Sequence, residues 1–237
     1  MKSIIEILIA RIAFWLGYGC RSITTNRNQF ARGIQKINML LAEAPHDILE
    51  TPGSINPQPG LTPTMLNWSV YMTIEHTDQV HVEILHLIEL LERGERPSLG
   101  DISRFDTIGP ASSDVLKDSY KHARQIETLP DRISLTSRNR VHHRIFGSLH
   151  SRGLYAALAM HLWLHVSQIK AILEKHAQKV LKGTVICRTS KLISHVLDFQ
   201  TLDTQAPTEV NRFRSGTDPA LSARTPLATL FIRIAPL

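Results

Sequence analysis

The chain has 237 residues, of which 43% are apolar, and its formal net charge is +6. This length suits one domain of ordinary size with extensions, or at most two small domains. The apolar share is that of a globular protein and excludes a wholly disordered or collagen-like chain. Lys and Arg are interspersed with acids, so we expect no nucleic-acid binding. Cys20 and Cys187 lie far apart without a CxxC pattern, which favours a reducing, cytoplasmic setting.

The first segment is apolar over residues 3–16 but is interrupted by Glu6 and Arg11. It is shorter than the roughly 20 residues that span a bilayer, and it has no convincing cleavage site of a signal peptide. We interpret it as an amphipathic helix in an extension over residues 1–22, with one apolar face formed by Ile5, Leu8 (or Ile9), Ile12 and Leu16. We do not expect membrane binding; a peripheral role through this helix is the alternative.

Helical periodicity continues in four longer segments, which cover residues 24–43, 67–91, 112–128 and 151–179. The predicted caps at their starts are Thr24 or Thr25, Asn67 or Ser69, and Ser151. The connecting segments at 51–64 and 98–111 contain prolines and predict loops, and residues 131–150 look irregular, with a turn at Phe146-Gly147-Ser148. We find no convincing strand, so we predict an all-α protein whose longest helices form a bundle over residues 23–179.

The C-terminal part, residues 180–237, has weak periodicity, several prolines and scattered charges. A short helix near 189–200 is compatible with this sequence, and we predict an irregular, poorly ordered tail for most of the remainder.

Three histidines fall on apolar helical faces. His161 and His165 are one turn apart on the stripe of the last long helix, which also contains Leu158 and Ile169. His76 lies on the stripe of the helix at 67–91. A buried imidazole without a partner costs roughly 1–3 kcal/mol, and one divalent metal ion would satisfy all three rings.

The HxxxH pair alone is weak evidence, because the chain has twelve histidines and chance pairs are expected. The alternative is that these rings are ordinary core or cleft residues. The chain has no HExxH motif, so a zincin-type protease is not supported.

Several motifs in order resemble the DinB-like family of metal-binding proteins. They are Trp68-Ser69-Val70 followed by His76, the segment Leu90–Pro97, the turn Phe146-Gly147-Ser148-Leu149, and the run from His161 through His165 to Gln168-Ile169. Together they cover roughly residues 24–178. The first 22 residues and those after Gln178 lie outside the resemblance.

The resemblance implies a four-helix bundle in which His76, His161 and His165 hold one divalent ion, with Zn, Ni or Fe as candidates. Several members of this family are transferases or isomerases that use a low-molecular-weight thiol such as bacillithiol or mycothiol, and members are often dimers. We therefore expect a small-molecule substrate, and a homodimer is compatible. The resemblance carries over the ligand positions but not the reaction type.

Other side chains near the predicted site have two interpretations each. Gln168 could hydrogen-bond a ligand or serve only as a helix-interface residue. His142 and His143 could line the site or lie exposed in their loop. Neither cysteine lies in the recognised core, so we assign no protein nucleophile, and catalytic residues stay unassigned. We assign no role to His81, His86, His122, His150, His176 or His195.

The functional hypothesis is a divalent-metal protein that activates water or an external thiol, as a thiol S-transferase or a hydrolase acting on a small electrophile. The alternative is a non-catalytic, metal-stabilised bundle in stress response. A fourth protein ligand, or the lack of a cleft beside the ion, would favour the alternative.

Overall fold

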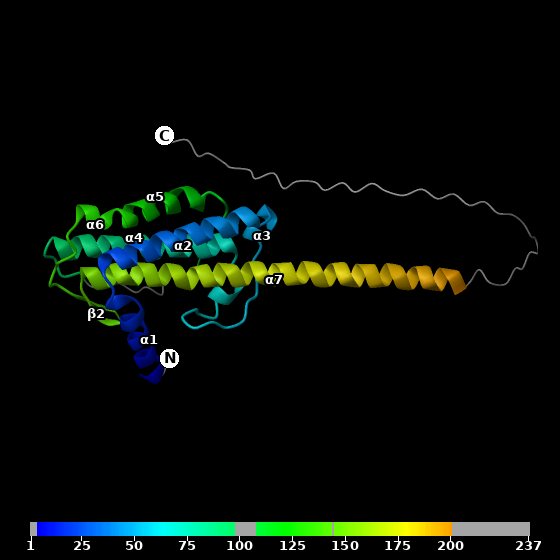
Figure 1. The fold of residues 1–237 in the computed structure, drawn as a ribbon, viewed down its shortest axis with the longest axis horizontal. Coiled ribbons are helices and arrows are strands. Elements are labelled where there is room, and N and C mark those ends of the chain that lie inside the picture. Colours follow the sequence, from blue (N-terminus) through cyan, green and yellow to red (C-terminus); the bar gives the residue numbers. More distant parts are fainter. Residues whose placement is uncertain (1–3, 98–107, 144, 201–237) are drawn as a thin grey trace, which may run out of the picture. The chain divides into compact units, whose positions relative to one another are not determined.

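The fold is known from a computed structural model, which describes residues 4–97, 108–143 and 145–200, with side chains within 8–179. Within these ranges the protein is mostly helical (Figure 1), which confirms the predicted all-α class. The helices are α1 (Ile4–Phe14), α2 (Ile23–Glu43), α3 (His46–Glu50), α4 (Val70–Glu92), α5 (Val115–Glu127), α6 (Leu129–Arg132) and α7 (Ser151–Gln200). A π-helical turn spans Trp15–Gly19 and a 3-10 turn spans Met65–Asn67.

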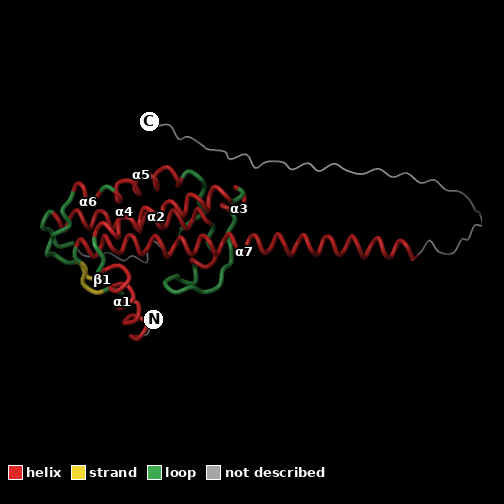
Figure 2. The backbone as a smooth tube through the Cα atoms, viewed as in Figure 1, coloured by secondary structure: helices red, strands yellow, loops and turns green. Residues whose placement is uncertain are grey.

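Two compact units divide the chain, Met1–Arg188 and Thr189–Leu237, and we describe each by itself. In the first unit α2, α4, α5 and the N-terminal half of α7 pack along one another, as the tube in Figure 2 shows. Their shared core is mainly aliphatic; its fully buried members include Phe30, Ile88, Ile126, Leu158 and Ile169. Of the second unit, the structure describes only the end of α7, Thr189–Gln200.

The last helix is longer than predicted, because α7 extends to Gln200 and not only to about Lys179. The stretch 180–200 contains Gly183 but no proline, so nothing in it forces the helix to stop. The predicted tail from residue 201 onward lies outside the described residues. The division into 1–22, 23–179 and 180–237 stays a prediction.

Side chains cap the starts of three helices, and two of the capping residues differ from those predicted. Ser69 caps α4 as predicted, because its hydroxyl accepts from the backbone N–H of Met72. Ser22, and not a threonine, caps α2 by accepting from the N–H of Thr25. At α7 the imidazole of His150 accepts from the N–H of Gly153, so this ring takes the role predicted for Ser151.

Two short strands correct the prediction that the chain has none. Strands β1 (Val141–His143) and β2 (Gly147–Leu149) pair in antiparallel register, with Val141 opposite Leu149. Gly147 has a φ of +79°, a conformation that side chains other than glycine rarely adopt, and this allows the tight turn predicted at 146–148. Both strands are only three residues long, which is why no alternation was visible in the sequence.

The N-terminal helix α1 contacts this hairpin. Phe14 is 1% exposed, and its ring lies 4.6 Å from that of Phe146, while the Arg11 guanidinium donates to the carbonyl of Ile145. The apolar face predicted for this helix is largely exposed, at Leu8, Ile9, Ile12 and Leu16. The side chain of Ile5 is outside the described set.

One helix of the first unit has the length and hydropathy of a membrane span. This is the Ser151–Lys179 part of α7, and 56% of its apolar window is buried in the protein. A core helix of a soluble protein meets the same criteria, so this finding does not locate the chain.

Candidate metal centre

The three histidines singled out in the sequence come together between α4 and α7. His76 and His165 are buried, His161 is partly buried, and one ring nitrogen from each lies within 4.8 Å of the other two. The ring centroid of His76 lies 5.4 Å from the ring centroid of His161 and 4.9 Å from that of His165. The HxxxH pair is one turn apart on α7, and its two Nε2 atoms are 3.1 Å apart.

This spacing suits a shared ion. Imidazole nitrogens bind zinc at about 2.0–2.1 Å, so two ligands of a tetrahedral ion stand about 3.4 Å apart. The separation of 3.1 Å between the Nε2 atoms of His161 and His165 is close to that value. The three candidate ligands are imidazole nitrogens, which bind Zn, Ni, Fe and Cu. The residues present therefore fit a divalent transition metal.

Gln168 fixes the tautomer of His165. The Gln168 side-chain nitrogen donates to the backbone carbonyl of Met65 at 2.7 Å, so its oxygen must face the ring. That oxygen accepts from Nδ1 of His165 at 2.7 Å. The proton therefore sits on Nδ1 and the Nε2 lone pair faces the cluster, an arrangement typical of metal-ligating histidines. Of the two interpretations of Gln168, the geometry selects the one in which it orients a ring of the site.

Burial keeps the cluster neutral. Desolvation is the main cause that lowers the pKa of His165 to about 3, with the neighbouring His76 charge adding to it. Desolvation also lowers the pKa of His161 well below its ordinary value, followed by the charges of His165 and its neighbours. Neutral rings are the form that binds metal, so the cluster keeps its imidazoles in the form that can act as ligands near neutral pH.

Trp68 forms one wall of the site. It is buried, and its ring lies 5.0 Å from that of His76. Trp163, by contrast, lies at the α2–α7 contact, where its indole N–H donates to the carbonyl of Gln29 at 2.9 Å. Both tryptophans are therefore packing residues, and Trp68 is the one that restricts the ring of a predicted ligand.

The two histidines of the hairpin differ in their surroundings. His142 is exposed, but His143 stacks on Phe146 at 4.6 Å, and its Nδ1 accepts from the backbone N–H groups of Ile145 and Phe146. Burial first, and then the His142 charge, lower the pKa of His143 to about 4. The His143 charge is the last and smallest of the causes that lower the pKa of His161.

Sequence reasoning missed a fourth histidine, His81. It is 4% exposed, and its ring centroid lies 5.4 Å from that of His161. His81 is five residues beyond His76, about 140° around an ideal helix, so it falls outside the stripe on which the prediction was based. A second buried stripe of α4 could have revealed it: Ile74, Thr77, His81, Leu85 and Ile88 follow helical spacing.

The comparisons with known proteins do not assign this site. No family model matches the chain, and no curated protein matches it either. The DinB-like resemblance therefore stays a prediction from the motifs of the sequence. The case for the site depends on the geometry of the chain itself.

Proposed function

We propose that this protein binds one divalent transition-metal ion through His76, His161 and His165. The observation that carries the proposal is the convergence of these three rings, with one nitrogen from each within 4.8 Å of the others in a largely buried setting. The hydrogen bond that directs the Nε2 lone pair of His165 into the cluster supports it. Zn, Ni and Fe are the candidate ions, and the surrounding helices are proposed to be a DinB-like four-helix bundle.

The same proposal includes an activity. Three protein ligands leave coordination positions open, as in catalytic zinc sites, and the partly exposed His161 is the side from which a small ligand would arrive. An ion held there by His76, His161 and His165 would lower the pKa of bound water or of a low-molecular-weight thiol. Hydrolysis of, or thiol transfer to, a small electrophile is the reaction class we propose.

A second candidate function is a non-catalytic, metal-stabilised bundle. The near-complete burial of His76 and His165 favours it, and the small cavity beside His81 is lined by none of the three proposed ligands. The two candidates differ in ligand exchange. Azide or a small thiol added to the Co²⁺-loaded protein should change its visible absorption if a position is open, and should leave it unchanged if the site is closed.

The binding proposal is tested by elemental analysis of the protein purified without an affinity tag. We expect about one equivalent of a divalent metal in the wild type and none in His76→Ala, because two imidazoles are left where three held the ion. His86→Ala is the matched control, since His86 lies exposed on the same helix; it should keep the full equivalent. No metal in the wild type after reconstitution, or a full equivalent in His76→Ala, would refute the assignment.

A further inference from the structure

The inference concerns His81, and it builds on the metal site proposed above. His81 Nε2 is buried and has no hydrogen-bond partner among the described residues. An unsatisfied buried polar atom costs roughly 1–3 kcal/mol. The ring lies between Phe30, at 5.5 Å, and His161, at 5.4 Å. An orphaned imidazole nitrogen in contact with a proposed metal ligand points to a partner that belongs to the site.

The chemistry of imidazole limits what kind of partner this is. A buried ring nitrogen is satisfied either by a hydrogen bond or by an ion. The Nε2 atom of His81 has neither among the described residues.

The position of His81 separates these two options. Its nitrogens are not part of the set that lies within 4.8 Å of one another, although its ring touches His161. Direct ligation would require the ring to move, whereas a molecule bound to the ion can bridge the remaining distance. We propose that His81 is a positioning residue that hydrogen-bonds to the non-protein ligand of the ion, a water molecule or a thiol.

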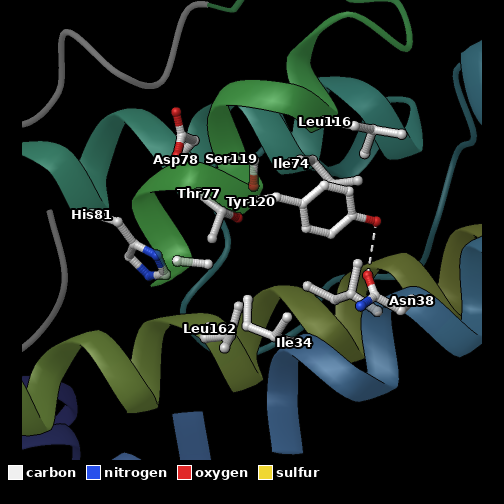
Figure 3. Close-up of a pocket in the computed structure, with 12 residues that line it drawn as sticks. Ile34, Asn38, Ile74, Thr77, Asp78, His81, Leu116, Ser119, Tyr120 and Leu162 are labelled. Atoms are coloured by element: carbon white, nitrogen blue, oxygen red, sulfur yellow. Dashed lines mark hydrogen bonds between the residues drawn. The ribbon is translucent and has the colours of Figure 1, made fainter. Parts of the chain in front are cut away.

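The surroundings of His81 fit this role. The ring also lines a small cavity of about 20 Å³ between α2, α4, α5 and α7, and Figure 3 shows it pointing from α4 toward α7. A cavity of this size is large enough for one water molecule. Tyr120 and Asn38 also line this cavity, and the Tyr120 hydroxyl donates to the side-chain oxygen of Asn38 at 2.8 Å. The His81 ring therefore has both the cavity and His161 of the proposed metal site as neighbours.

The test compares metal affinity in the full chain, measured with Co²⁺ by competition against a chelator. In His81→Phe we expect one ion to bind still, with an affinity 10–100-fold weaker, the usual effect of losing a group that orients the ligands of a metal. His81→Gln should recover part of the loss, because its amide can form a hydrogen bond and a phenyl ring cannot. His86→Ala should bind like the wild type.

Three results would overturn the proposal. The first is an unchanged affinity in His81→Phe with the fold intact by circular dichroism. The second is equal weakening in His81→Phe and His81→Gln, which would mean a packing role. The third is four imidazole nitrogens in the Cu²⁺ paramagnetic resonance spectrum of the wild type and three in His81→Phe, which would make His81 a direct ligand. Failure of the metal site itself would look different, because the wild type would then bind no ion.

Discussion

The side chain of Gln168 shows how one hydrogen bond can fix the tautomer of a ring, here His165, one of the three proposed metal ligands. Its amide cannot turn over without facing its nitrogen toward His165 and its oxygen toward the Met65 carbonyl. Two hydrogen bonds of 2.7 Å, both made by Gln168, therefore hold the buried His165 ring in one tautomer. Without them, the ring could carry its proton on Nε2 and present no lone pair to the cluster.

Replacing Gln168 should weaken metal binding without abolishing it. We expect Gln168→Ala to lower the affinity 10–100-fold, since His165 would lose the acceptor that fixes its proton on Nδ1. The stoichiometry at saturating metal should stay at one, because all three ligands remain. Chelator competition measures both quantities.

The matched control for this change is Gln178→Ala, on the exposed side of the same helix, which should leave the affinity unchanged. If Gln168→Ala bound metal as tightly as the wild type, the hydrogen bond would have no part in preparing the site.

At the scale of helices, Gly33 sets the approach of α2 to α7. A Cβ atom at this position would lie 2.6 Å from Cδ2 of Leu162, closer than side chains normally come. The absence of a side chain lets the two backbones approach, and the Trp163 indole then reaches the Gln29 carbonyl. Leu162 lies next to His161, so this contact also helps to place the face of α7 that carries two of the proposed metal ligands.

Filling this contact should destabilise the protein. Gly33→Val is expected to lower the free energy of unfolding by about 1–3 kcal/mol, the usual cost of overpacking a core. Gln35→Val is the control, because it adds the same β-branched residue to an exposed position of the same helix. Urea unfolding of the metal-free proteins gives the comparison. Equal stabilities for the two variants would show that α2 and α7 do not need this close contact.

Helical faces explain what could be predicted from the sequence and what could not. His76, His161 and His165 were predicted because each falls on an apolar stripe, and the structure brings them together. His81 was missed because α4 is buried over two adjacent stripes, and periodicity in a single sequence does not say how wide a buried face is. On the predicted stripe, Val80 and Ile84 are only partly buried.

Contacts distant in sequence account for the other differences. The hairpin around Gly147 contacts α1, whose Arg11 donates to the carbonyl of Ile145 over 134 positions of sequence separation. The one-turn helix α6 is held in part by Arg27 of α2, which binds Asp131 through two hydrogen bonds of 2.8 and 2.9 Å. Neither contact can be derived from local propensity, because each needs the packed fold to bring its partners together.

At the scale of the whole protein, the buried histidines make stability depend on pH. In the folded, metal-free chain the pKa is about 3 for His81 and His165 and about 4 for His143, mainly because burial disfavours the charged ring. An unfolded histidine has a pKa near 6.5. Between these values the unfolded chain binds more protons than the folded one. The stabilising contribution is therefore complete above pH 6.5 and is lost progressively as the pH falls toward 3.

We expect the free energy of unfolding of the metal-free protein to fall between pH 7 and pH 5.5, by up to about 1.4 kcal/mol per pH unit for each ring. Asp78 acts with the opposite sign, because burial raises its pKa, so the comparison stops above the range in which carboxyl groups titrate. Urea unfolding across this interval measures the slope. His143→Gln should reduce the slope, and a variant at an exposed position of α4, His86→Ala, is the control. A stability that stays constant from pH 7 to 5.5 would mean that the rings accept protons in the folded state, and the cluster would then not hold its nitrogens ready for an ion.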